Sequence, residues 1–312
     1  MPPLQYHTGQ LQIQSEANTT EVARKLAFWV GPIKEFVAGA DLILLAVLDR
    51  DGMLRFTVIS GKPPLVTSIN SRNDVNSRFL INSISVESIS GFYGGLAISM
   101  ANARRVRING QLIKNNIGTE LETKETFTLC KKYIAPTIAL GEKQHLGPVS
   151  RDQISIHDPW LNNMVTKSET AFLASISPDE KPDVAHRGGP PGFLKVDAET
   201  QQLSWQEFVG DGIFKSAGNI RAKSKLTLLL PDFESGDGIE ITGQGVYQNL
   251  RFDKKEREDP LVKHKEDFPV QGIMNCINIQ AYKLTGLLHP RKRLDKAIRI
   301  TSRMPAWEQA PQ

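Results

Sequence analysis

The chain has 312 residues, of which 40% are hydrophobic and 23% are charged, and its formal net charge is +4. These proportions are ordinary for a folded globular protein, and the length allows one large domain or two of usual size. The small net charge argues against a nucleic-acid partner, and no apolar stretch approaches the roughly 20 residues that cross a bilayer, so no membrane segment is expected.

The N-terminus and the cysteines indicate a compartment. The first residues lack the basic stretch and apolar run that mark a secretory signal. Cys130 and Cys276 lie far apart and outside any CxxC pattern, which argues against a disulfide framework and a zinc site. We therefore expect a cytoplasmic protein with two buried, reduced thiols. The six histidines show no metal-binding spacing, and no metal site is expected.

The first predicted elements are a helix and a hairpin. Asn18-Thr19-Thr20-Glu21 is a helix start with a capping-box acid, and the helix is predicted to run from Val22 to Val37. A strand at 42–47, a turn at 49–52 and a second strand from Phe56 follow. The second strand is broken at Gly61-Lys62-Pro63-Pro64, because proline cannot donate to a strand ladder.

This pattern occurs a second time when the sequence is slid by about 127 positions. Pro32 then falls on Pro159, Gly61 on Gly188, and Pro63-Pro64 on Pro190-Pro191. A further echo aligns residues 107–111 with residues 240–244. Two hairpins can resemble each other by chance, but shared turns and prolines at a fixed offset favour a duplicated unit.

The repeat predicts the domain organisation and the fold class. We expect a mainly β chain with short helices, of the α+β class, with an N-terminal domain at 1–138 and a linker at 139–156. A C-terminal domain at 157–290 and a basic tail at 291–312 complete the chain. The charged run 251–267 is predicted to be a solvated loop or helix face.

The most informative segment is Asp183-Val184-Ala185-His186-Arg187-Gly188-Gly189-Pro190-Pro191-Gly192-Phe193. Alternation along a strand puts Arg187 on one face and His186 on the other. An arginine at a strand end, followed by Gly188 and Gly189, lets the backbone approach a ligand while the guanidinium holds an anion. The alternative is a surface arginine beside a sharp turn.

A second segment, Gly210 to Ile220, follows a strand that ends at Trp205-Gln206. We predict a helix that is capped by Asp211 or begins near Gly212. Lys215 and Asn219 are four residues apart and share a helix face. A helix N-terminus with a lysine in its first turn is suited to a phosphate, so Arg187 and Lys215 are predicted to hold one phosphate from two sides. The alternative is an ordinary amphipathic helix with Lys215 in solvent.

Together these segments resemble the FMN-binding, pyridoxamine 5′-phosphate oxidase-like split-barrel proteins, and in particular a branch with two barrels in one chain. The likeness is carried by Ala185 to Phe193, Gly210 to Ile220, Cys130-Lys131-Lys132-Tyr133-Ile134 and the turn Asp232 to Asp237. It covers roughly residues 7 to 250.

The resemblance implies two tandem split β-barrels that bind FMN. Its phosphate would lie between Arg187 and Lys215, and its ring edge would meet backbone groups of the glycines after Arg187. The complete predicted cofactor-binding set is His186, Arg187, Gly188, Gly189, Trp205, Gln206, Lys215, Ser216 and Asn219. For His186, a packed strand histidine is the alternative to a place beside the flavin.

The repeat also predicts the number of flavin sites. At the same offset Arg187 falls on Ser60 and His186 on Ile59, so the first copy lacks the anion-binding arginine. We therefore expect one FMN per chain, with the N-terminal half as the far wall of the site. Because single-barrel relatives hold the flavin between two subunits, a homodimer is one alternative, and a barrel face already covered by the tandem copy is the other.

The implied function is an FMN-dependent oxidoreductase that acts on a small molecule, with no catalytic residue identified. The sequence contains no GxSxG, no phosphate-binding P-loop and no evident acid–base pair. Two alternatives remain open. One is a flavin-binding protein without a dedicated substrate, acting as carrier, sensor or stress protein; the other is a relative that binds haem or no cofactor.

Overall fold

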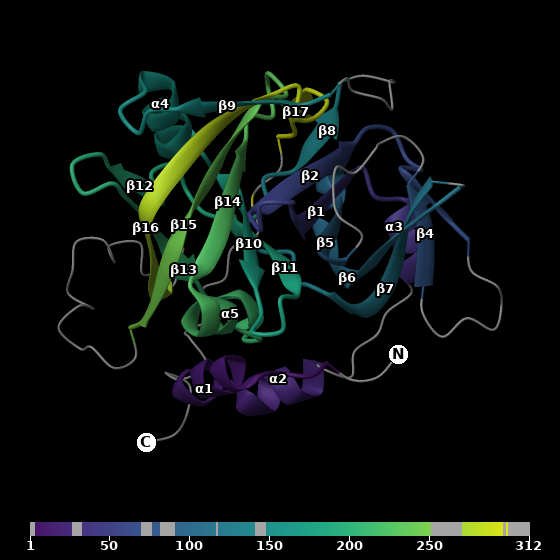
Figure 1. The fold of residues 1–312 in the computed structure, drawn as a ribbon, viewed down its shortest axis with the longest axis horizontal. Coiled ribbons are helices and arrows are strands. Elements are labelled where there is room, and N and C mark those ends of the chain that lie inside the picture. The colour runs from purple at the N-terminus through teal and green to yellow at the C-terminus, as the bar shows by residue number, and fades with distance from the viewer. Residues whose placement is uncertain are drawn as a thin grey trace.

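The computed structural model describes residues 4–26, 33–69, 77–81, 91–116, 118–140, 148–250, 270–295 and 298. Two curled sheets lie side by side, and a small strand pair lies at the opposite end of the molecule from helices α1 and α2 (Figure 1). The predicted charged run 251–267 lies outside the described residues.

The N-terminal half begins with helices and continues as an antiparallel sheet. Its helices are α1 (Thr8–Glu16), α2 (Thr20–Leu26), α3 (Ile33–Ala38) and the 3-10 turn η1 (Met100–Asn102). Its strands are β1 (Leu42–Leu48), β2 (Leu54–Ser60), β3 (Val66–Ser68), β4 (Ser77–Ile81), β5 (Phe92–Ser99), β6 (Arg104–Asn115), β7 (Gly118–Thr128) and β8 (Thr137–Ala139).

The C-terminal half repeats this plan. Its helices are α4 (Pro159–Lys167) and α5 (Lys215–Lys223). Its strands are β9 (Ser150–Ile154), β10 (Thr170–Ile176), β11 (Pro182–Gly188), β12 (Leu194–Asp197), β13 (Gln202–Phe208), β14 (Lys225–Pro231), β15 (Gly238–Asn249), β16 (Val270–Thr285) and β17 (Arg291–Arg293). Helix α4 begins with a capped turn, in which the Asp158 carboxylate accepts from the Trp160 N–H and Pro159 fills the first helical position.

The two large sheets have one strand order. The first runs β2-β1-β5-β6-β7-β4-β3, and the second runs β11-β10-β14-β15-β16-β13-β12, with β9 added beside β16. Strand by strand, β1 to β7 correspond to β10 to β16. The predicted fold class, a mainly β chain with short helices and two tandem split barrels, is confirmed by this arrangement.

The strand registers correct one residue-level prediction. Leu42 pairs with Ser60 in the first hairpin, and Thr170 pairs with Gly188 in the second. The offset between the strands of the two halves is therefore one residue larger than the offset between their prolines. Arg187 therefore corresponds to Ile59 and not to Ser60. Because a one-residue shift sends a strand side chain to the opposite face, this changes which face of the first sheet matches the arginine.

Three apolar clusters hold the fold together. One fills the C-terminal sheet, one fills the N-terminal sheet, and the third lies between the halves. In the third cluster, Leu44 and Ala46 of β1 pack with Phe172 and Ala174 of β10. This explains why β1 and β10 are apolar at nearly every position. One face of each strand packs into the core of its own half, and the other face packs against the opposite half.

Two buried ion pairs join the halves at structurally equivalent positions. Where one pair has its arginine the other has its carboxylate, and the reverse. Arg107 of β6 pairs with Asp183 of β11 at 3.3 Å. Glu240, which corresponds to Arg107, pairs with Arg55 of β2, which corresponds to Asp183, at 2.7 Å. The predicted echo between residues 107–111 and 240–244 therefore aligns positions with the same place in the fold and opposite charge.

Two predicted boundary segments contain regular structure. The predicted linker 139–156 includes β9, which pairs with β16 along residues 281–285. The predicted basic tail begins with β17, which pairs with β8 of the N-terminal half. The division of the chain into two domains at these residues stays a prediction. The strand pair β8–β17 joins the end of the predicted N-terminal domain to the start of the predicted basic tail.

Candidate functional site

A small cavity lies where the C-terminal half meets the N-terminal half. Its volume is about 90 Å³. Six of the nine predicted cofactor-binding residues line it, namely His186, Arg187, Gly188, Gln206, Lys215 and Ser216. The other three, Gly189, Trp205 and Asn219, are not among its lining residues. The sequence thus predicts a group of residues that the fold brings together around one cavity.

The N-terminal half supplies the opposite wall, with residues that are not in the predicted cofactor-binding set. They are Arg105, Arg107, Leu129, Cys130 and Tyr133. A signal for two of them exists in the sequence: Arg105 and Arg107 are two apart in a strand, on the face opposite the apolar Val106 and Ile108. Two arginines on one strand face indicate an anion or a carboxylate partner, but the strand pattern alone does not say which.

Arg105 is buried without a carboxylate partner among the described residues. Only 7% of its surface is exposed. Its guanidinium donates to Nδ1 of His186 at 2.9 Å and to the carbonyl of Lys132 at 3.3 Å, and it lies 3.5 Å from the Cys130 thiol. Burial lowers the pKa of Arg105, while nearby Cys130 and Asp211 act in the opposite direction. A buried cation in such surroundings is stabilised by any anion that enters the cavity.

His186 lines the same cavity and is neutral. Burial lowers the pKa of His186 well below its usual value, and the charges of Arg105 and Arg187 lower it further. Since Nδ1 accepts from Arg105, the ring hydrogen is on Nε2. Nε2 has no hydrogen-bond partner among the described residues. The ring also packs edge-on against Phe172, so both readings of this residue, a packed strand histidine and a residue at the site, hold together.

Arg187 is engaged by a carboxylate in its own half. Its Nε donates to Glu207 of β13 at 2.6 Å, and the Trp205 indole N–H donates to the same oxygen at 2.7 Å. Trp205 is therefore a buried support for Glu207 and does not reach the cavity, whereas its neighbour Gln206 does. Arg187 and Lys215 both line the cavity, and each is paired with a carboxylate; their predicted approach to one phosphate stays a prediction.

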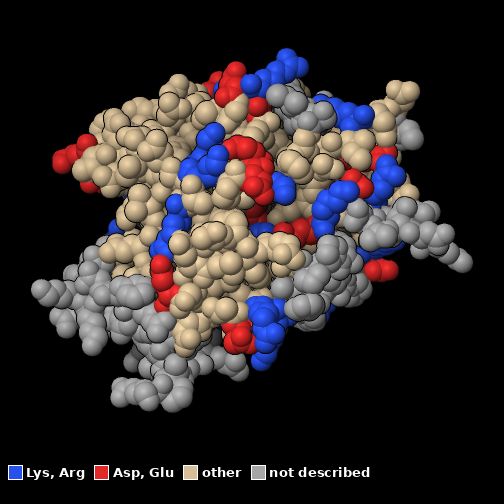
Figure 2. Space-filling model, turned by 60° about the horizontal axis from the view of Figure 1, so that its bottom comes forward, with Lys and Arg blue, Asp and Glu red and all other residues tan. Residues whose placement is uncertain are grey.

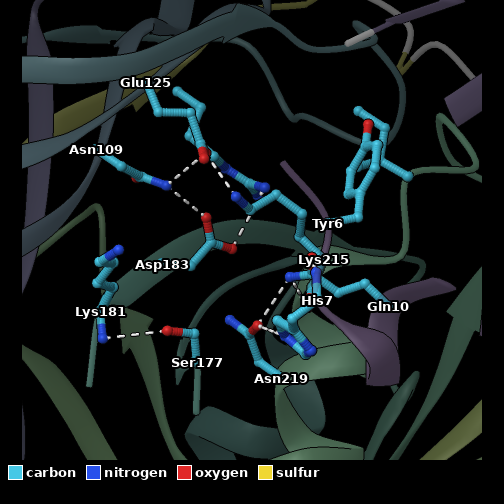
Figure 3. A network of polar contacts seen from close by, with 12 residues as sticks. Tyr6, His7, Gln10, Asn109, Glu125, Ser177, Lys181, Asp183, Lys215 and Asn219 are labelled. Carbon is cyan, nitrogen blue, oxygen red and sulfur yellow. Dashed lines mark hydrogen bonds and ion pairs between the residues drawn. The ribbon is translucent and has the colours of Figure 1, made fainter. Parts of the chain in front are cut away.

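Lys215 joins a polar network across the two halves (Figure 3). Its ammonium lies 2.6 Å from Glu125 of β7, which also accepts from the Asn109 amide at 3.0 Å. Asn109 in turn donates to Asp183 at 2.9 Å. These residues line a second, larger cleft of about 560 Å³, and Lys215 lines both the cleft and the small cavity.

Helix α5 begins three residues later than the predicted cap. Phe214 in the left-handed region precedes the first helical residue, Lys215. The Asp211 carboxylate accepts from the Ile213 N–H and so closes the turn before the helix. The predicted position of Lys215 in the first turn is nevertheless found. Ser216 and Lys215 are both buried, although the sequence alternative placed Lys215 in solvent.

Asn219 is occupied by the N-terminal helix α1, an element the sequence analysis did not predict. Its carbonyl oxygen accepts from Gln10 at 2.9 Å and lies 2.8 Å from Nε2 of His7, and its amide donates to Ser175. Helices α1 and α2 lie beneath α5 in Figure 1. The contact is close because Gly218 faces Gln10, where a Cβ would lie 2.5 Å from the Gln10 Cα. Helix α1 thus covers one side of the larger cleft.

Gly188 and Gly189 have packing reasons for lacking a side chain. A Cβ on Gly188 would lie 2.0 Å from the Tyr133 carbonyl, so the glycine lets the N-terminal half approach the end of β11. A Cβ on Gly189 would meet the rings of Phe193 and Phe208. Gly188 thus permits the close approach of protein backbone and Gly189 that of two aromatic side chains, and their predicted contact with a ligand stays a prediction.

The equivalent location in the other half lacks the charged groups. Ile59 stands where the C-terminal half has Arg187, and it is fully buried in the N-terminal apolar cluster. The pairings of β10, β14 and β15 place Gly238 at the position of Arg105. The two halves therefore differ at two cationic positions around otherwise matching strands.

The surface around the candidate site has no uniform charge on the face that carries α1 and α2. Lys and Arg lie interspersed with Asp and Glu there (Figure 2). Among the described residues, no group of three or more His, Cys, Asp or Glu side chains is placed to hold a metal ion. Within the same residues, no helix has both the length and the apolar character required to span a membrane.

Comparison with known proteins finds solved structures that are similar to parts of this chain. No protein-family model matches the chain, and no curated protein matches it. A pyridoxamine 5′-phosphate oxidase-related, FMN-binding protein from Nostoc punctiforme is 10% identical, over 48% of this chain and 98% of that one, with a TM-score of 0.29. General stress protein 26 from Bacillus anthracis is 18% identical, over 43% and 98%, with a TM-score of 0.28.

A third structure, of HupZ from Group A Streptococcus, is 12% identical over 40% of this chain and 98% of that chain, with a TM-score of 0.31. Likenesses of this degree say nothing of the activity. With one strand order in both halves and two curled sheets packed against each other, the chain consists of two tandem split barrels.

Proposed function

We propose that this chain binds FMN between its two halves and uses it as an oxidoreductase acting on a small molecule. The observation that carries the proposal is Arg105: a buried guanidinium, without a carboxylate partner among the described residues, in a cavity that Arg187 and Lys215 also line. With Arg107, four cationic side chains line this cavity and favour a multiply charged anion, and arginine is well shaped to bind two phosphate oxygens at once.

Two further features fit a phosphate-bearing flavin. His186 lines the cavity, and its buried Nε2–H has no partner among the described residues, which is a cost that a rearrangement around a ligand can relieve. The small cavity, at about 90 Å³, is below the roughly 300–1,000 Å³ of small-molecule sites, whereas the adjoining cleft of about 560 Å³ lies within it. Lys215 borders both spaces, so one ligand can place an anionic group in the first and its bulk in the second.

In this proposal the flavin supplies hydride acceptance and electron transfer, and the protein supplies binding and orientation. Arg105, Arg187 and Lys215 hold the phosphate. Neutral His186 keeps its position through the bond that Nδ1 accepts from Arg105. Helix α1 covers the cleft and limits the access of water to it.

The test is an FMN titration of the purified chain, freed of any bound flavin, followed by the quenching of flavin fluorescence. We expect saturable binding that weakens at least about tenfold in Arg105→Gln and in Arg187→Ala, a loss of about 1.4 kcal/mol or more. Arg55→Gln removes a guanidinium from the same interface but outside the cavity, and we expect it to bind FMN as the unaltered chain does. A chain that ignores FMN, or an Arg105→Gln variant with unchanged affinity, contradicts the proposal.

The finer part of the proposal, the oxidoreductase activity, has a separate test. The FMN-loaded chain is mixed anaerobically with nicotinamide nucleotides and with a panel of small metabolites, and loss of the oxidised-flavin absorbance is followed in time. Rapid bleaching by one compound supports an enzyme and names its reductant. Slow, unselective bleaching by all of them would instead indicate a flavin-binding protein without a dedicated substrate.

A further inference from the structure

One side of the larger cleft is closed by the N-terminal segment, defined as residues 4–26, which includes α1 and α2. Five of its residues line the cleft, namely Leu4, Gln5, Tyr6, His7 and Gln10. Figure 3 shows His7 and Gln10 beside Asn219 of α5. The wall of the cleft is therefore complete only while this segment lies in place.

Side chains of the N-terminal segment bind it to the stretch of chain that leads into α5. Nε2 of Gln14 donates to the Ile213 carbonyl at 2.8 Å, and the Thr19 hydroxyl donates to the Gly212 carbonyl at 2.9 Å. Helix α1 also makes the contacts with Asn219 described above. Since Gly212 and Ile213 line the small cavity, the segment closes the cleft and also supports one wall of the cavity.

The N-terminal segment is held more by these polar bonds than by apolar packing. Leu4 packs with Phe127 and Ile213 in a small cluster that is separate from the three large ones. Ile13 packs in the C-terminal cluster, but Leu11 of the same helix is 46% exposed. Water can replace the lost hydrogen bonds when the segment moves. Its release therefore costs less than separation of the two sheets, which exposes the apolar cluster between them.

A ligand can reach the proposed binding site only if part of its wall moves. Arg105 and Lys215 are 7% and 8% exposed, and the small cavity that they line has a volume of about 90 Å³. Arg105 and Arg187 belong to the two large sheets, whereas Lys215 directly follows the wall to which the N-terminal segment is bonded. Movement of this segment is therefore the least costly way to open the site.

We propose that the N-terminal segment is a lid that opens as one unit to admit and release the ligand, with the bonds of Gln14 and Thr19 holding it closed. The identity of the ligand rests on the function proposed above, whereas the opening is a property of the chain alone. With the lid open, the cleft loses one wall, and residues 212–213 lose the side chains that fix them. Closure restores both around the bound ligand.

The first experiment is native-state hydrogen exchange on the full chain without FMN, at urea concentrations below those that unfold it. It compares the amides of residues 11–17 with those of β10, which is buried along its whole length. We expect the α1 amides to exchange through one common opening, at least about tenfold faster than β10. Their exchange should also depend less on urea, because the opening exposes less surface than global unfolding. Exchange of α1 only together with β10 overturns the proposal.

Two glutamines of α1 provide a matched pair of variants. Gln14 is buried and bonded to the Ile213 carbonyl, whereas Gln12 is exposed. Gln14→Ala removes one bond of the closed lid, and we expect α1 to exchange about tenfold faster. Gln12→Ala makes the same chemical change without that loss and should leave the exchange rate unchanged. Equal exchange rates in the two variants overturn the role of Gln14.

The passage of the ligand has its own readout, the rates of FMN association and dissociation in rapid mixing. Because the lid opens in both the free and the bound chain, Gln14→Ala should raise both rates by a similar factor of about ten and leave Kd nearly unchanged. Loss of a residue that only supports the site would raise Kd instead. Rates equal to those of the unaltered chain overturn the gating of the ligand. A chain that binds no FMN contradicts the proposed function, and hydrogen exchange still decides whether the lid opens.

Discussion

Arg105 of β6 donates a 2.9 Å hydrogen bond to Nδ1 of His186 on β11, across the boundary between the two halves. The bond fixes the ring tautomer and leaves the buried Nε2–H without a partner among the described residues. It also makes protonation of His186 unfavourable, because the imidazolium would carry a second positive charge beside a guanidinium. The imidazole is thus held neutral by the group it faces.

This relationship predicts a loss of stability at acidic pH. The pKa of His186 is lowered in the folded chain, so below about 6.5 the unfolded chain binds a proton that the folded chain does not. Stability from this residue is present above about pH 6.5 and is lost as the pH falls below it, by up to about 1.4 kcal/mol per pH unit. Urea unfolding at pH 7.5 and at pH 5.5 measures the difference.

The matched variant for that measurement is His186→Gln, which keeps an acceptor for Arg105 but does not titrate. Its loss of stability between the two pH values should be smaller than that of the unaltered chain. The pKa of His289 is also lowered by burial, and it contributes a loss of the same sign to both proteins. Equal losses in the two proteins would show that His186 is not the group responsible.

The number of flavin sites is a second prediction, which rests on the proposed function. Ile59 and Gly238 stand where the working site has Arg187 and Arg105, so the equivalent location offers no cation at either position. We expect one FMN per chain at saturation, measured from flavin absorbance against protein concentration after dialysis. Two flavins per chain would mean that the N-terminal half binds the cofactor without these cations.

Helix α1 provides a third prediction. In Gly218→Ala, the added Cβ would lie 2.5 Å from the Gln10 Cα, so α1 has to move away from α5. We expect faster amide hydrogen exchange across residues 8–16 and a loss of about 1–3 kcal/mol in the free energy of unfolding. Gly39→Ala is the control, because its Cβ would meet ordinary contacts at 3.4 Å or more. Unchanged exchange in α1 would contradict the close helix contact.

The buried carboxylate of Glu240 provides a fourth prediction. It is fully buried and accepts from Arg55 at 2.7 Å, from the Phe56 N–H at 3.1 Å and from Arg151 at 3.3 Å. Glu240→Ala leaves the Arg55 guanidinium half-buried and unpaired on this side, and we expect the free energy of unfolding to fall by about 3 kcal/mol. Glu21→Ala breaks an exposed pair with Arg24 and should cause no measurable change in urea unfolding.

The arrangement of the sheets was predictable because prolines, glycines and apolar runs mark the same places in both halves. The exact correspondence was not, because spacing between these markers differs by one residue on each side of the strands. The second copy has one more residue between Pro159 and β10 than the first has between Pro32 and β1, and one fewer between β11 and its Pro-Pro pair. A sequence comparison anchored on prolines therefore misplaces Arg187 by one position.

Helix α1 and Arg105 were missed for physical reasons. The buried face of α1 includes Gln10, which donates to Asn219 of α5, and Gln14, which donates to the Ile213 carbonyl before α5, so no apolar periodicity marks it as a helix. Arg105 lies in a segment recognisable as a strand, but what it faces depends on how the two halves pack, and local pattern carries no information about that. His186, Arg187 and Lys215 could be predicted to lie together because each of the two segments that contain them has an informative order of residues.

The exchanged ion pairs determine which halves can associate. Across the interface, Arg107 meets Asp183 at one place and Glu240 meets Arg55 at the other. If two C-terminal halves associated through this surface, Asp183 of one would face Glu240 of the other, and two N-terminal halves would bring Arg55 against Arg107. Either arrangement buries like charges together, so each half repels a copy of itself and accepts only its complement.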